Sequence, residues 1–234
     1  MQQNLQQKKN LVENVFNKVF DKYDLMNDFM SFGIHRIWKK ELIYMMNPSK
    51  DQKLLDVASG TGDVAKIYSE LTDNKSHIIC IDPNDKMISQ GKKKLKKYKN
   101  IKWKIGNAEK LDLPDNTFDY YTIVFGLRNT KNINKSISEA YRVLKKGGRF
   151  LSLEFSKVEN YNLNYIYKNY SKLIPIIGQI VVGDRKPYDY LIESIDKFIN
   201  QKQLIKIMKN NMFINCTYKN LSGGIASIHS GWKI

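Results

Sequence analysis

The stretch LLDVASGTGD, residues 54–63, constrains the fold of this chain more than any other segment. It reads as a buried apolar strand that runs directly into a glycine-rich turn and the start of a helix. Gly60 and Gly62 allow positive φ angles and a close approach of the backbone to a ligand, and the helix start presents free N–H groups to that ligand. The segment therefore predicts a site for a nucleotide-like cofactor at this turn.

The residues around the turn leave two cofactors open. Gly60, Gly62 and Ala65 satisfy the dinucleotide pattern G-x-G-x-x-G/A. Asp82 ends the next apolar strand about 20 residues further on, where its carboxylate can accept hydrogen bonds from ribose hydroxyls. NAD and S-adenosylmethionine both carry an adenosine ribose and both need this arrangement. Asp56, followed by SGTGD, is similar to the first motif of class I methyltransferases and favours S-adenosylmethionine.

Strand-like and helix-like segments alternate through the middle of the chain, without an internal repeat or a Gly/Ser-rich linker. This alternation predicts an α/β fold with a doubly wound, mostly parallel seven-stranded sheet in a single domain, residues 1–234. The expected strands are 54–58, 77–82, 101–106, 120–126, 149–155, 214–220 and 224–231. The expected helices, with apolar residues three and four positions apart, are 64–72, 85–97, 133–144 and 201–211.

Two segments lie outside this alternation and are rich in aromatic and long apolar residues. The first is residues 11–47, and the second, residues 157–200, is inserted between the fifth and sixth expected strands. Each can pack as ordinary core, or each can form a lid over a lipid-like substrate, since flexible apolar side chains suit an adaptable pocket. Pro175 and two glycines argue against one long regular helix in the second segment.

Composition narrows the partners of the chain. The formal net charge of +16 has three open explanations: a general abundance of lysine, attraction to an anionic membrane surface, or nucleic acid. We expect no nucleic-acid partner, because no recognition motif for one is present. Cys80 and Cys216 lie in no metal-binding spacing, so we expect free thiols, a reducing compartment and no metal. Without a membrane-spanning run or the apolar core of a signal peptide, the sequence predicts a cytoplasmic protein.

Polar residues follow the third and fourth expected strands, at the edge where open α/β sheets bind ligands. Asn107 and Ala108 come after the third strand, and this short polar loop can accept a hydrogen bond from an adenine amine. The segment FGLRN places Arg128 and Asn129 just past the fourth strand, where packing alone does not explain them. Glu154, at the end of the fifth strand, either faces this crevice or is a paired structural carboxylate.

Taken together, these motifs resemble one methyltransferase family. FGLRN, EAYRVLKKGGRFLSLEFS, YDLMNDFMSFGIHRIWK and the terminal SGGIASIHSGWK are similar to the C-methyltransferases of ubiquinone/menaquinone biosynthesis, over nearly the whole chain. The resemblance implies a class I, Rossmann-like, S-adenosylmethionine-dependent methylation of 2-methoxy-6-polyprenyl-1,4-benzoquinol, demethylmenaquinol or both. It also implies a homodimer or a quinone-pathway complex and, because the acceptor is polyprenylated, peripheral contact with the inner face of an anionic membrane. A non-catalytic scaffold of such a complex is the alternative.

The resemblance also implies a set of cofactor-binding residues. These are Gly60, Thr61, Gly62, Asp82, Asn107, Ala108 and Val124. Asp82 is expected on the ribose, and Asn107 with Ala108 around the adenine. Val124 stands where the family often has a serine, so one hydroxyl contact to the cofactor is expected to be missing.

For the methyl acceptor, the resemblance implies roles for three residues. Arg128 and Asn129 are expected to orient the phenol oxygen or a water that takes its proton, with the arginine charge favouring a developing phenolate. Arginine itself is a poor base, because its pKa is above about 12. Tyr23 is expected to contact the substrate, or else to be a core tyrosine with a satisfied hydroxyl.

Overall fold

The computed structural model describes residues 28, 31 and 33–234 of the chain. Tyr23 and most of the predicted lid at residues 11–47 lie outside these residues, so their predicted roles are not tested here.

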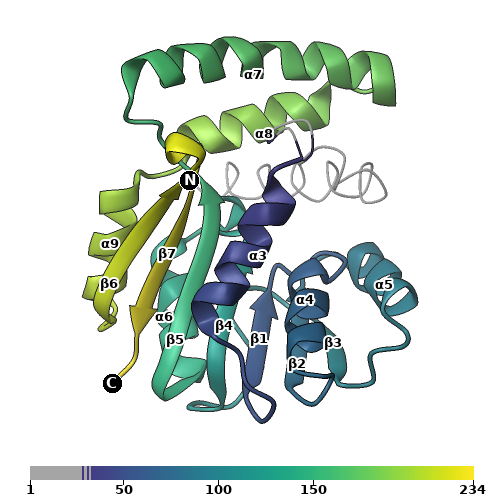
Figure 1. Cartoon of the computed structure of the whole chain (residues 1–234), viewed down its shortest axis with the longest axis vertical. Helices are drawn as coiled ribbons and strands as arrows, with labels where there is room; N and C mark the ends of the chain where they lie inside the picture. The colour runs from purple at the N-terminus through teal and green to yellow at the C-terminus, as the bar shows by residue number, and fades with distance from the viewer. Residues whose placement is uncertain (1–27, 29–30, 32) are drawn as a thin grey trace.

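A seven-stranded sheet forms the centre of the molecule, as the sequence predicts (Figure 1). Its strand order is β3-β2-β1-β4-β5-β7-β6. The strands are β1 Lys53–Val57, β2 His77–Asp82, β3 Ile101–Ile105, β4 Phe118–Val124, β5 Leu144–Phe155, β6 Ile214–Leu221 and β7 Ala226–Trp232. Neighbours from β3 to β5 are parallel, and β7 is antiparallel to both β5 and β6. The order reverses between β1 and β4, and such a switch point is where open α/β sheets bind ligands.

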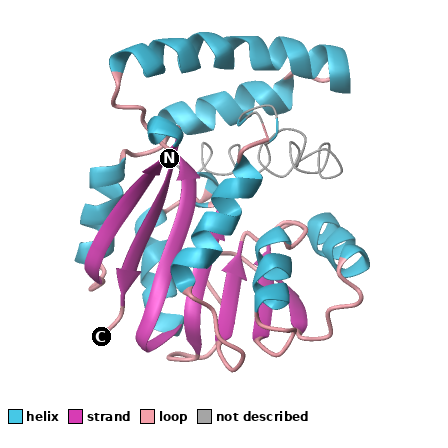
Figure 2. Cartoon of the chain, viewed as in Figure 1, coloured by secondary structure: helices cyan, strands magenta, loops and turns pink. Residues whose placement is uncertain are grey.

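Helices cover both faces of the sheet (Figure 2). They are α3 His35–Met46, α4 Asp63–Leu71, α5 Asp85–Lys94, α6 Ile133–Val143 and α9 Gln201–Asn210. Successive residues of β1 point to opposite faces: Leu54 packs in a cluster with Leu42 of α3, and Leu55 packs in another with Ile137 of α6 and Leu204 of α9. Within the predicted lid 11–47, the described helix α3 is therefore core, because its apolar side packs on the sheet.

The inserted segment forms two helices beyond the carboxyl ends of the parallel strands (Figure 1). They are α7 Tyr161–Val182 and α8 Lys186–Lys197. The expected break does not occur at Pro175, because α7 continues through this residue, but Gly183, with a left-handed φ of 78°, ends α7, so the segment is not one long helix. Packing outweighs the hydrogen bond that proline removes. Ile174 is fully buried, and a Cβ on Gly178 would lie only 2.2 Å from Cδ2 of Tyr188, so α8 lies close against α7 at this glycine.

Candidate active site

The glycine turn after β1 lies at the switch point, and its two glycines have different environments. Gly60 and Gly62 have φ angles of 55° and 86°, in the left-handed region that favours glycine. A Cβ on Gly62 would lie 2.6 Å from Cη2 of Trp103, whereas a Cβ on Gly60 would meet nothing within 4 Å. Packing inside the protein thus requires Gly62, while Gly60 borders open space that a ligand can occupy.

Asp82 joins the glycine turn to the loop after β2. One carboxylate oxygen accepts a hydrogen bond from the Gly60 N–H at 2.9 Å, and the other accepts from the Asn84 N–H at 2.9 Å. Burial raises the pKa of Asp82 to about 6. Each carboxylate oxygen can still accept another hydrogen bond, which suits the two hydroxyls of a ribose.

Asp56 is buried at the carboxyl end of β1, just before the turn. Its Oδ1 accepts a hydrogen bond from the Thr122 hydroxyl at 2.8 Å, and burial raises its pKa to about 7. Its Oδ2 has no hydrogen-bond partner among the described residues. An unpaired buried oxygen is costly. Asp56 therefore fits a site that a polar cofactor completes.

Two lysines form ion pairs at the end of the turn, and the sequence analysis predicted a site role for neither of them. Asp63, the first residue of α4, pairs with Lys39 of α3 at 2.8 Å and with Lys94 of α5 at 2.7 Å. Burial opposes ionisation, but the two lysines hold the pKa of Asp63 well below its usual range. Lys94 also donates to the Thr61 hydroxyl at 3.1 Å. The N-terminal helix α3 is thus attached to the cofactor turn by a largely buried ion pair.

The loop after β3 holds itself in shape through Asn107. Its side-chain oxygen accepts a hydrogen bond from the Glu109 N–H at 2.9 Å, and its carbonyl accepts from the Lys110 N–H at 3.1 Å. The Gly106 N–H donates to the Asp82 carbonyl at 3.1 Å, which places the loop beside the ribose candidate. Ala108 is buried in the core cluster. Since the Asn107 oxygens already serve the loop, contact with an adenine amine stays a prediction.

Arg128 lies beyond β4 in a buried ion pair with Glu154 of β5. Arg128 Nη1 donates hydrogen bonds to Glu154 Oε1 at 2.5 Å and to the Phe125 carbonyl at 2.7 Å. The Arg128 backbone N–H donates to Glu154 Oε2 at 3.1 Å. Burial raises the pKa of Glu154, although the Arg128 charge opposes this. Of the two interpretations of Glu154, the structure supports the paired carboxylate.

Helix α8 supplies two further residues, which the sequence analysis did not single out. The Tyr190 hydroxyl donates to Asn129 Oδ1 at 2.9 Å, and Arg128 Nε donates to the Ser194 hydroxyl at 3.3 Å. No local pattern marks these residues, since they lie more than 60 residues from their partners. The inserted segment therefore positions the predicted acceptor-side residues directly.

The two candidate regions meet at the ends of β1 and β4. A Cβ on Gly126 would lie 2.3 Å from the Cβ of Ala58, so FGLRN packs directly against the residues that lead into the glycine turn. Ala58 and Phe125 both have positive φ angles, 52° and 54°, where the chain turns out of its strand. Val124 is half-buried against the core beside this contact. The structure thus brings the predicted cofactor turn and the predicted acceptor residues to adjacent strand ends.

The described part of the chain contains neither a metal-binding cluster nor a helix that could span a membrane. There, no group of three or more His, Cys, Asp or Glu residues is placed to hold a metal ion. Cys80 and Cys216 are free thiols. Among the described helices, none is long and apolar enough to cross a membrane.

Comparison with solved structures defines the fold. A methyltransferase of Thermotoga maritima, named as S-adenosylmethionine-dependent and possibly a histamine N-methyltransferase, superposes with a TM-score of 0.66. It is 18% identical, with 95% of this chain and 99% of that chain covered. An S-adenosylmethionine-dependent methyltransferase of Aquifex aeolicus gives a TM-score of 0.63 at 16% identity, covering 84% and 89% of the two chains. The fold is that of the class I S-adenosylmethionine-dependent methyltransferases, as predicted.

Sequence comparison identifies the family. The ubiE/COQ5 methyltransferase family model matches residues 2–233. The ubiquinone/menaquinone biosynthesis C-methyltransferase UbiE of Rickettsia bellii (strain RML369-C) is 50% identical over 235 residues, which cover 97% of this chain and 94% of that protein. UbiE of Rickettsia prowazekii (strain Madrid E) is also 50% identical, covering 96% and 93%. The chain belongs to the ubiE/COQ5 methyltransferase family, which confirms the resemblance and the predicted class of enzyme.

Proposed function

We propose that this protein transfers the methyl group of S-adenosylmethionine to a ring carbon of a polyprenylated quinol. The acceptor is 2-methoxy-6-polyprenyl-1,4-benzoquinol, demethylmenaquinol or both. The names of the Rickettsia relatives support this acceptor class. One observation carries the reaction: the contact between Gly126 and Ala58 packs the FGLRN segment against the residues that lead into the glycine turn. A cofactor at the turn and an acceptor at FGLRN would therefore be neighbours.

On the cofactor side, the proposed binding residues are those expected from the sequence. They are Gly60, Thr61, Gly62, Asp82, Asn107, Ala108 and Val124. S-adenosylmethionine supplies an electrophilic methyl group on a sulfonium centre. Three features support this placement: the open space at Gly60, the free acceptor capacity of Asp82, and Asp56 Oδ2, which has no partner among the described residues.

On the acceptor side, Asn129 is the residue that we propose contacts the quinol. Methylation of an aromatic carbon needs electron density, which a hydroquinol supplies as a phenolic proton leaves. Tyr190 already donates to Asn129 Oδ1, so the amide N–H groups are the donors suited to a phenol or phenolate oxygen. Arg128 acts as a positioning residue with a positive potential that Glu154 partly balances. Tyr23 remains a proposed substrate contact.

The assay for this proposal measures transfer of labelled methyl from S-adenosylmethionine to two reduced short-chain acceptors. These are 2-methoxy-6-prenyl-1,4-benzoquinol and demethylmenaquinol. Wild type is expected to methylate at least one of them, and Asn129→Ala is expected to lower kcat about 100-fold with unchanged cofactor affinity. Tyr190→Phe should lower kcat less, because it removes the hydrogen bond that orients the Asn129 amide but leaves the amide itself in place. Asn134→Ala, on the exposed side of α6, is the matched control.

Two results would count against the proposal. If wild type binds the cofactor but methylates neither acceptor, the activity belongs to another acceptor, or the protein is a non-catalytic scaffold of a quinone-pathway complex. If Asn129→Ala matches Asn134→Ala, Asn129 does not contact the reacting quinol. Size measurements on the same samples would test the homodimer or quinone-pathway complex that the family resemblance implies.

A further inference from the structure

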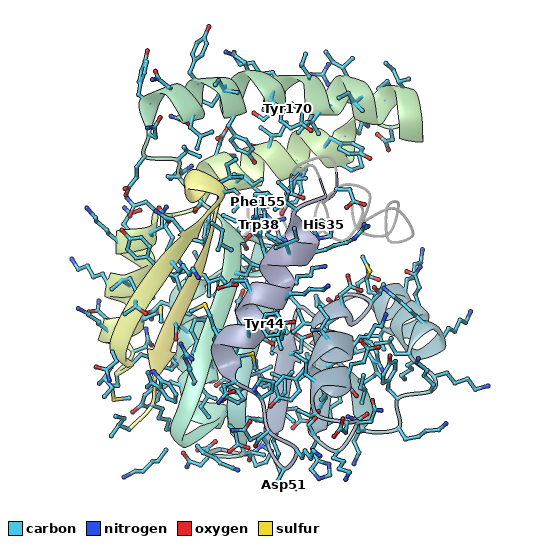
Figure 3. All side chains as sticks on the ribbon, viewed as in Figure 1. His35, Trp38, Tyr44, Asp51, Phe155 and Tyr170 are labelled. Carbon is cyan, nitrogen blue, oxygen red and sulfur yellow. The ribbon has the colours of Figure 1, made fainter. Side chains whose placement is uncertain are left out.

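The outer side of α7 carries large apolar side chains that no described residue covers. They are between 49% and 82% exposed. The residues are Tyr161, Tyr165, Ile166, Leu173, Ile176 and Ile180. Figure 3 shows side chains projecting from α7 on the side away from the sheet. Single exposed apolar residues are ordinary, but a run of six along one helix marks an interaction surface.

The spacing of these residues places them on one face of α7. Tyr161 and Tyr165 are one turn apart, as are Ile176 and Ile180, and the exposed residues between them share this side. The opposite side holds the buried residues Tyr167 and Ile174, in the same cluster as residues of α8. Helix α7 thus presents large apolar side chains on two sides, with the exposed Asn162 and Asn169 among those of the outer side, and the described residues cover only the inner side.

The charges of α7 select the kind of partner. The helix contains no aspartate or glutamate, and its two lysines, Lys168 and Lys172, are both exposed. Two of the three acidic residues of the neighbouring α8 have local partners, since Asp189 pairs with Arg185 at 3.0 Å and Glu193 pairs with Lys197. The third, Asp196, is exposed, and Lys157 donates to its backbone carbonyl. The outer side of α7 thus combines tyrosine, isoleucine and leucine with positive charge only, within a chain of net charge +16.

We propose that the outer face of α7 docks on an anionic lipid bilayer. The apolar side chains enter the boundary between head groups and acyl chains, and Lys168 and Lys172 lie at the lipid phosphates. Tyrosine suits this boundary because its ring is apolar and its hydroxyl is polar. A second copy of the chain fits less well. A symmetric contact would bring the lysines of two α7 helices together without an acidic residue on α7 to pair with them.

Docking through α7 would orient the active site toward the membrane. Helix α7 packs on α8, and α8 contacts Asn129 through Tyr190 and Arg128 through Ser194. The acceptor side of the site therefore lies behind α7 and α8, on the side of the proposed bilayer. This last step rests on the proposed function, because it explains how a quinol with its prenyl tail in the bilayer reaches Asn129.

Vesicle flotation of the full chain tests the docking surface. The vesicles are phosphatidylcholine alone, or phosphatidylcholine with phosphatidylglycerol, at low and high salt. Wild type is expected to float with the anionic vesicles and to dissociate partly at high salt. Ile166→Ser with Ile180→Ser should lower binding at least tenfold at both salt concentrations, because it removes apolar contact. Lys168→Gln with Lys172→Gln should lower binding about tenfold at low salt only.

A matched control separates this face from exposed apolar residues in general. Tyr44→Ser with Met212→Ser changes two residues of similar exposure on other elements, and binding should stay at the wild-type level. Equal binding by wild type and the Ile166/Ile180 variant would overturn the proposal. So would a shift of that variant from dimer to monomer without loss of vesicle binding, which would make this face an interface between copies of the chain.

Methyl transfer to a short-chain quinol without vesicles keeps the two proposals distinguishable. The α7 variants are expected to retain wild-type transfer in this assay, which also shows that they are folded. If wild type floats through α7 but transfers no methyl group, the proposed function fails and the docking surface stands. If wild type transfers the methyl group normally but does not float, the docking surface fails and the proposed function stands.

Discussion

The cofactor side and the acceptor side of the site are built in different ways. Gly60 and Asp82 belong to one β-α-β unit, and backbone N–H groups make the contacts that join them. Arg128 and Asn129 are held by side chains of β5 and α8, which are 26 to 66 residues away in the sequence. A local motif therefore sets the backbone of the first region, although its Asp56 and Asp63 side chains also have distant partners, whereas long-range side-chain pairs mainly hold the second region.

This contrast predicts different responses to substitution. On the cofactor side, a changed residue alters a turn whose backbone is supported by neighbouring strands, and affinity should suffer first. On the acceptor side, Arg128 and Glu154 are both buried, so removal of either partner leaves a charge without compensation. Stability and activity should therefore be lost together there.

The largest effect is expected for Glu154→Ala. This substitution leaves the Arg128 guanidinium buried without its carboxylate and should lower the free energy of unfolding by about 3–5 kcal/mol. Urea unfolding at pH 7.5 measures the change. Glu193→Ala is the control, since it breaks the exposed pair with Lys197 and should leave the unfolding curve nearly unchanged.

A double variant separates stability from catalysis at the same pair. Arg128→Met with Glu154→Leu replaces both charges by apolar side chains, and most of the stability should return. Methyl transfer should remain lost if the Arg128 charge serves the reaction. Recovery of both stability and transfer would show that the ion pair is structural only.

Gly62→Ala and Gly60→Ala should differ, because Gly62 is enclosed by the described residues and Gly60 is not. Both alanines would occupy the left-handed region, at a cost of about 1–2 kcal/mol. Gly62→Ala also forces a Cβ against Trp103 and Leu95, which adds about 1–3 kcal/mol. Gly60→Ala should instead weaken binding of S-adenosylhomocysteine at least tenfold. Unfolding curves and calorimetric titration measure the two effects, and normal binding by Gly60→Ala would place the cofactor elsewhere.

The parts of the fold that could be predicted from the sequence are those with local signals. The expected strands and helices correspond to observed elements, because each has its own periodicity and the turn has its glycines. β5 begins at Leu144, earlier than the predicted 149, because its first residues pair across an irregular register with β4. The family was recognisable because its motifs extend over nearly the whole chain.

The rest depended on tertiary contacts that leave no local pattern. Pro175 suggested a broken helix, yet the close approach of Tyr188 at Gly178 favours a continuous α7. The role of Glu154 depends on the pairing register of β4 and β5, which the sequence does not reveal. Val124 lies opposite Leu153, so Glu154 lies level with the start of FGLRN. The Lys39 contact with Asp63 joins two elements that share no motif.

A smaller effect, dependent on pH, is expected at Asp56, a buried carboxylate that accepts a hydrogen bond from Thr122 and, among the described residues, from no cation. Burial raises its pKa from 3.8 to about 7. Between these values the folded state retains a proton that the unfolded state releases, so stability falls as pH rises from about 4 to 7. One such group contributes at most about 1.4 kcal/mol per pH unit. Asp82, with a pKa of about 6, acts in the same direction.

Asp56→Asn isolates this contribution, because an asparagine oxygen can still accept the Thr122 hydrogen bond. Urea unfolding at pH 5, 6, 7 and 8 should show the variant gaining stability relative to wild type as pH rises, with the difference levelling off above pH 7. Asp51→Asn, at an exposed turn before β1 (Figure 3), controls for the loss of one negative charge. A difference that is the same at every pH would mean that Asp56 is ionised throughout this range. The cofactor side would then hold a second buried charge besides the Lys39–Asp63 pair, and the contrast between the two regions would be weaker.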